Sequence, residues 1–129
     1  MIVAGLVFAA LAAAVHIVIF YLESCAWAGE RARTLFRTGS AEEAEATRFL
    51  AFNQGFYNLF LALLASIGVV ATAAGASTAG VTLTLAGTGS MLAAATVLFV
   101  SSPPHRSAAL KQGLLPLLAV VALVLGVTS

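Results

Sequence analysis

The residues best suited to chemistry are His16, Glu23 and a group of carboxamides within residues 51–60. Asn53, Gln54 and Asn58 lie in that segment beside Tyr57, although the run around them is apolar. A buried amide without a hydrogen-bond partner costs a few kcal/mol, so another part of the protein should face these groups. We expect His16 and Glu23 to face them and predict one polar pocket between two apolar segments.

The composition predicts that lipid is the solvent for most of the chain. Of its 129 residues, 61% are hydrophobic and only 9% are charged, whereas ordinary soluble domains have about 25% charged residues. Only Arg106 and Lys111 carry charge outside residues 23–48, and the net charge of +1 gives no reason to expect a nucleic-acid partner. With Cys25 alone and two distant histidines, we expect no disulfide, no metal and no cofactor.

Four stretches are long enough to cross a bilayer, which requires about 20 apolar residues. The predicted fold is an all-α, four-transmembrane-helix bundle forming one membrane domain over residues 1–129. Its spans should cover residues 2–23, 48–72, 79–101 and 107–127. The first run is not expected to be a signal peptide, because no Lys or Arg precedes it and it exceeds the usual ~7–15 apolar residues. Gly, Ser and Thr in the third span indicate close helix packing.

The basic residues predict how the bundle is oriented. All six Lys and Arg lie in the connections between spans one and two and between spans three and four, which share one face. The positive-inside rule places that face in the cytoplasm and both termini outside, in a cell inner membrane or plasma membrane.

The first connection, residues 24–47, should be more than a plain loop. Ser40 and Glu43 fit a capping box that starts a helix, which we expect to continue into the second span. Three arginines, Arg31, Arg33 and Arg37, should end an extension of the first helix, with Gly39 as the break. The result would be a helical hairpin projecting into water, the alternative being a solvated charged loop.

Helical geometry places the candidate site residues on shared faces. His16 and Glu23 are seven residues apart, which is two turns, and Trp27 continues their stripe. Gln54 and Asn58 share one face of the second span, and Asn53 and Tyr57 share an adjoining one. At a rise of 1.5 Å per residue, His16 and Asn53 should both lie about 10 Å below the cytoplasmic boundary. An ionisable residue within a span is by default a functional-site hypothesis.

Each of these residues also has a plainer interpretation. Glu23 could reach interfacial water, and His16 could be a neutral histidine satisfied by a carboxamide. Aromatic residues gather in the first two spans, where they could attract a cation, pack against neighbours or form an interfacial belt. In the fourth span Pro116 frees the carbonyl of Gln112, which could serve the pocket.

The predicted site combines these observations. We assign catalytic roles to Glu23 and His16, and substrate binding to Asn53, Gln54, Tyr57, Asn58, Trp27, Phe20, Phe56, Phe60 and Gln112.

Several of these segments together resemble a known family. They are His16 followed by Tyr21-Leu22-Glu23, then Trp27, Asn53-Gln54-Gly55-Phe56-Tyr57-Asn58, and Gln112-Gly113 with a proline nearby. In this the chain is similar to the small membrane family called domain of unknown function 1304. The resemblance spans nearly the whole chain and implies a four-helix membrane protein, but it supplies no function.

Three functions fit the sequence. The first is an enzyme that isomerises or cyclises an isoprenoid or sterol-like substrate, with Glu23 as general acid and His16 orienting it or acting as base. Membrane sterol isomerases combine similar residue types in a helical cavity, which is an analogy rather than a motif match. The second is an accessory subunit whose polar groups lock helices together. The third is a small proton-coupled exporter working as a dimer. The expected partners are the bilayer and a lipophilic small molecule, with a homo-oligomer allowed.

Overall fold

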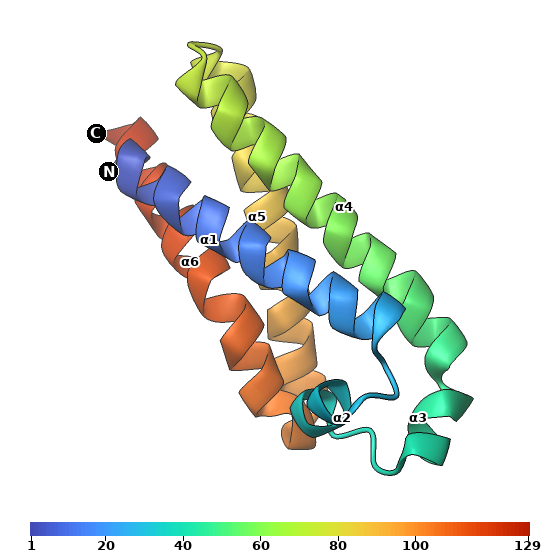
Figure 1. Ribbon diagram of the computed structural model, residues 1–129. Helices are drawn as coiled ribbons and strands as arrows, with labels where there is room; N and C mark the ends of the chain where they lie inside the picture. The colour runs from blue at the N-terminus through green and yellow to red at the C-terminus, as the bar shows by residue number, and fades with distance from the viewer.

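The computed structural model describes residues 1–129, and its regular elements are all helices (Figure 1). Four segments are long and apolar enough to cross a membrane, which confirms the predicted all-α bundle of a multi-pass membrane protein. They comprise α1 (Ile2–Phe20) with the π-helical turn η1 (Tyr21–Cys25), α4 (Arg48–Ala73), α5 (Ser77–Ser101), and the 3₁₀ turn η2 (Pro103–His105) with α6 (Arg106–Thr128).

The four long helices form a ring in which each packs against two neighbours. The order around the ring is α1, α4, α5 and α6, and α6 closes it against α1. Successive helices run in opposite directions, so both termini lie at one end (Figure 1). The short helices α2 (Glu30–Phe36) and α3 (Ala41–Ala46) lie at the other end. We call residues 26–47 the lid, and name the two halves of the bundle the terminal half and the lid half.

In the terminal half, glycines allow the helices to approach closely. A Cβ at Gly68 of α4 would collide with the backbone and hydroxyl of Thr84, and would lie 2.7 Å from the carbonyl oxygen of Gly80 on α5. The hydroxyl of Thr84 donates to the carbonyl of Gly80 at 2.8 Å, and Thr72 bonds its own helix similarly at Gly68, at 2.9 Å. Close packing of the third span, predicted from its small residues, is therefore confirmed at Gly80.

In the lid half, the close contacts change partners. The hydroxyl of Ser24 in η1 donates to the carbonyl of Phe52 on α4 at 2.8 Å. Gly55 makes this approach possible, because a Cβ there would collide with the Ser24 hydroxyl. On the other side of the ring, Gly113 of α6 packs against Ala95 of α5. Meanwhile α4 and α5 separate toward the lid (Figure 1), so the lid half consists of two helix pairs, α1 with α4 and α5 with α6. Side chains from both pairs line a cavity there.

The lid differs from the predicted hairpin in two ways. The first long helix ends at Cys25, and the arginines of α2 belong to a separate short helix. The capping box is confirmed, with the Ser40 amide donating to the Glu43 carboxylate at 2.6 Å. The helix it starts, however, stops at Ala46, and α4 begins only after Thr47, so the expected continuous helix is wrong. The break before the box lies where predicted, with Gly39 at φ 83°.

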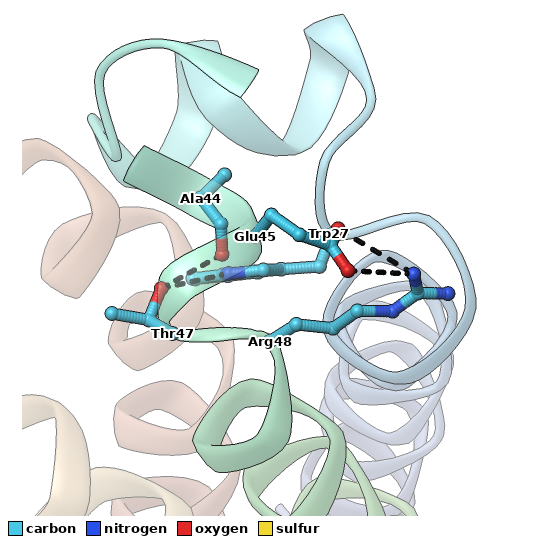
Figure 2. A network of polar contacts seen from close by, with 5 residues as sticks. All are labelled: Trp27, Ala44, Glu45, Thr47 and Arg48. Carbon is cyan, nitrogen blue, oxygen red and sulfur yellow. Dashed lines mark hydrogen bonds and ion pairs between the residues drawn. The ribbon is translucent and has the colours of Figure 1, made fainter. Parts of the chain in front are cut away.

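The lid folds back over the bundle instead of projecting into water. The Trp27 indole donates to the hydroxyl of Thr47 at 3.1 Å, and Figure 2 shows this contact beside the Glu45–Arg48 ion pair. The Trp27 ring also lies 5.4 Å from the ring of Phe36. The two ends of the lid are thereby joined across its interior, and it covers the space between the helix pairs.

Candidate functional site

A central cavity of about 510 Å³ occupies the lid half. Drug-sized ligands in other proteins occupy pockets of about 300–1,000 Å³. All four long helices and the lid contribute to its wall: His16, Glu23, Trp27, Phe36, Arg37, Thr38, Glu43, Thr47, Gln54, Asn58, Leu61, Met91, Ala94, Leu98, His105, Ala108 and Gln112. Met91 belongs to the alanine core of the bundle and Leu61 packs against it, so these two residues form the cavity floor toward the terminal half.

Glu23 reaches the cavity from the π-helical turn. A π turn bonds each amide to the carbonyl five residues back and often marks a functional site. The carboxylate Oε2 accepts a hydrogen bond of 2.7 Å from the side-chain amide of Asn58. Glu23 is only 8% exposed, so the interfacial alternative is not what the structure shows. Its Oε1 has no hydrogen-bond partner in the chain and is left for a bound molecule.

His16 lies on the same wall, two turns earlier on α1, and is almost completely buried. Its Nδ1 lies 2.9 Å from the carbonyl oxygen of Ala12. A carbonyl only accepts, so Nδ1 carries the hydrogen and the neutral ring keeps a lone pair on Nε2. Nε2 has no partner in the chain, which makes it the nitrogen available to a ligand. The alternative that a carboxamide of the second span satisfies His16 is not what the structure shows, because His16 bonds only the Ala12 carbonyl and Asn58 bonds Glu23.

Three carboxamides line the cavity from two further helices. Asn58 and Gln54 lie one turn apart on α4, and Gln112 projects from α6. The amide of Asn58 also donates to the backbone carbonyl of Gln54 at 3.3 Å, which fixes its orientation toward Glu23. Pro116 is fully buried one turn after Gln112 and cannot donate to that residue's carbonyl.

The roof of the cavity is polar. The hydroxyl of Thr38 is sealed from solvent and has no hydrogen-bond partner. His105 of η2 is held at both nitrogens, by the Ser102 hydroxyl at 2.6 Å and by the Phe36 carbonyl at 2.9 Å. The second bond ties the lid to the connection between α5 and α6. Arg37 and Glu43 complete the roof, next to the left-handed turn at Arg37.

Several predicted site residues lie elsewhere, so their assignment to the pocket is corrected. Asn53 and Tyr57 are exposed on the outer surface of α4, because α4 turns the face that carries Gln54 and Asn58 toward the cavity. The rings of Phe20, Phe56 and Phe60 are likewise outside the cavity. Phe20 and Phe56 pack edge to face at 5.1 Å, and Phe60 continues that row along α4 with 58% of its surface exposed.

Apart from Trp27, which was predicted, sequence reasoning missed the contributions of the lid and of η2. Phe36, Thr38 and His105 line the cavity, but each lies in a connection that we interpreted as solvent-facing. Only the capping box at Ser40 signalled ordered structure there. No group of three His, Cys, Asp or Glu side chains is placed to hold a metal ion.

Comparison with protein families identifies the chain's relatives. A family described as a protein of unknown function (DUF1304) matches residues 10–124. The chain belongs to this family. The match runs from the middle of α1 to the end of α6, so it includes every residue of the cavity wall. Comparison with curated proteins and with solved structures gave no match. The cavity is therefore the basis for the function proposed for this DUF1304 protein.

Proposed function

We propose that this protein is an integral membrane enzyme that performs acid–base chemistry on a lipophilic substrate in the central cavity. The reaction class is isomerisation or cyclisation of an isoprenoid or sterol-like molecule. One observation carries the proposal. Glu23 and His16 line the same cavity, and each has one atom fixed by the protein and one atom free.

In this mechanism, protonated Glu23 is the general acid. Asn58 holds Oε2, so Oε1 delivers the proton to an alkene, epoxide or carbonyl of the substrate. Nε2 of His16 accepts the proton released elsewhere on the substrate. The two residues lie roughly 10 Å apart along the helix axis, so the substrate extends between them. Between turnovers His16 releases its proton to solvent and Glu23 takes one up, so no net proton is consumed and solvent deuterium enters the product.

The remaining cavity residues suit such a substrate. Trp27 and Phe36 line the lid side, where their ring faces stabilise a developing carbocation. Gln54 and Gln112 offer donors and acceptors to a hydroxyl or carbonyl group. Aliphatic side chains, among them Leu61 and Leu98, contact the hydrocarbon part.

The shape of the bundle favours an enzyme over the two alternatives. An exporter needs a route to both sides of the membrane. A hollow of about 600 Å³ does lie in the terminal half, but the buried alanine core and Met91 pack the bundle between it and the central cavity. An accessory subunit that only joins helices does not need a cavity of about 510 Å³ containing unpaired titratable atoms. We also propose that the lid end lies in the cytoplasm of a cell inner or plasma membrane, because all six Lys and Arg lie at that end.

The test is incorporation of solvent deuterium into isoprenoid and sterol-like lipids incubated with the purified protein. Glu23→Gln and His16→Gln should each lower the rate by about 10²–10⁴-fold, the usual contribution of general acid–base catalysis, with melting temperatures near that of the parent. Glu45→Gln, which changes an exposed lid carboxylate, is the control and should keep full activity. Full activity in Glu23→Gln would refute the mechanism. Proton-driven uptake into vesicles that requires Glu23 would identify an exporter instead.

A further inference from the structure

A second hollow lies on the outer surface of the bundle, between α1 and α6. Its volume is about 180 Å³, and the first span lines it with four aliphatic residues, Val15, Val18 and Ile19 of α1 and Leu22 of η1. These residues belong to a segment long and apolar enough to span the membrane. We call this hollow the α1–α6 groove. In a bundle that spans the membrane, its aliphatic wall faces the hydrocarbon, so an apolar molecule can enter the groove without crossing water.

The groove and the central cavity share part of their walls. Phe36, Ala108 and Gln112 line both hollows. One layer of side chains therefore separates a groove facing the bilayer from a polar cavity. Ala108 is small, and Gln112 is long, unbranched and only partly buried. Gln112 can turn its carboxamide toward either hollow, so it is the residue that a molecule passing between them would displace.

We propose that the α1–α6 groove holds the hydrocarbon chain of a single-chain amphiphile whose uncharged oxygen group, a hydroxyl or carbonyl, lies in the central cavity. This inference rests on the proposed function and names the substrate class of that site. The oxygen group meets Gln112 first and then Gln54, whose carboxamides both donate and accept, whereas Asn58, whose amide hydrogens are engaged, accepts through Oδ1. The chain stays against the aliphatic surface of α1, and the substrate reaches the site directly from the membrane.

A membrane phospholipid is the competing occupant. A charged hollow at the lid surface adjoins the groove through Leu35 and Lys111, and Arg31 lines it as well. A phosphate there would meet two cations, but Glu30 lines the same hollow and offsets one of them. Glu30, Arg31 and Lys111 are all exposed, which makes a weak phosphate site. The observations favour an amphiphile that enters the central cavity.

Trp27 provides a direct measurement of binding, since it is the only tryptophan and lines the cavity but not the groove. The experiment titrates the full chain, in micelles of an unbrominated detergent, with long-chain alcohols brominated either beside the hydroxyl or at the far end. The first probe should cause a saturable loss of Trp27 emission, and the second should cause much less. Equal quenching by both probes, or none by either, would overturn the proposal.

Two matched double variants locate the chain. Val15→Phe/Val18→Phe fills the groove and should abolish the saturable quenching. Ala14→Phe/Ile17→Phe adds the same bulk to exposed neighbours on α1 outside the groove and should leave quenching intact. If instead Ala94→Phe, on the α5 wall of the cavity, abolishes quenching while the groove variant does not, the chain enters between α4 and α5 and the groove is excluded. A third outcome would identify a phospholipid site: the groove variant retains quenching by the alcohol, and quenching is lost when the detergent is replaced by micelles of an anionic phospholipid.

This readout is independent of turnover. If the brominated alcohol binds as expected but Glu23→Gln keeps full deuterium exchange, the groove assignment stands and the acid–base mechanism fails. If exchange depends on Glu23 but the groove variant neither lowers quenching nor raises the KM, the mechanism stands and the groove assignment fails.

Discussion

The two halves of the bundle differ in whether polar side chains form hydrogen bonds between helices. In the terminal half, the hydroxyls of Thr72 and Thr84 bond carbonyls of their own helices, and the helices meet through glycine. In the lid half, polar side chains bond across helices, as Glu23 does with Asn58 and His105 with the lid. Apolar close packing needs no such bridges in a membrane. The comparison indicates that the terminal half supplies stability and the lid half supplies the site.

The largest expected effect is a loss of stability from one methyl group in the terminal half. Gly68→Ala would place a Cβ against the backbone of Thr84 and Gly80, neither of which can move without displacing α5. Overpacking of this kind costs about 1–3 kcal/mol, and the unfolding midpoint in a denaturing-detergent titration should fall accordingly. Gly89→Ala on α5 is the control, because nothing lies within 4 Å of its Cβ. If Gly89→Ala lowered the unfolding midpoint as much as Gly68→Ala, the close approach at Gly68 would not be what stabilises the terminal half.

An effect of the same order is expected from the polar pair in the lid half. Asn58→Leu leaves the buried Glu23 carboxylate without its donor and should lower the free energy of unfolding by about 1–3 kcal/mol. Replacing both partners, in Glu23→Leu/Asn58→Leu, should restore stability to the parent level or above, because an apolar pair needs no hydrogen bond. The same titration measures both variants. A double variant less stable than Asn58→Leu would show that the pair serves the fold, which would favour the accessory-subunit alternative.

The smallest effect concerns the lid in acid. Hydrogen bonds from the backbone and side chain of Ser40 hold the pKa of the Glu43 carboxyl below its ordinary value of 4.5. A lowered pKa stabilises the capped helix at and above pH 4.5, and this stabilisation is lost as the pH falls through the lowered pKa. Trp27 emission should therefore shift below pH 4.5, because a loosened α3 no longer holds the Thr47 hydroxyl against the Trp27 indole.

Two carboxamide variants assign that transition. Glu43→Gln cannot titrate but still fits the capping box, so it should lose the acid shift of Trp27 emission. Glu42→Gln, whose side chain takes no part in the box, should retain it. An acid shift that persists unchanged in Glu43→Gln would place its origin outside the lid.

Sequence reasoning succeeded where the physical constraint was local or general. The shortage of charge predicted a membrane bundle, and the expense of burying polar groups brought His16, Glu23 and Asn58 to one pocket. It failed at Asn53 and Tyr57 and at the phenylalanines Phe20, Phe56 and Phe60. Which face of a helix turns toward the cavity depends on the rotation of the helix about its axis, and only tertiary packing sets that rotation. Sequence reasoning also failed for Phe36 and His105. Their positions depend on the lid folding back over the helix ends, which no local pattern encodes.

The π-helical turn at Tyr21–Cys25 has a consequence for how this protein can vary. Such a turn arises when an α-helix accommodates one additional residue. Deleting Tyr21 or Leu22 would rotate Glu23 by about 100° relative to α1, carrying it away from Asn58 although every remaining amino acid is unchanged. The alignment of acid and amide is thus specified by chain length, and a scan of substitutions alone would pass over it.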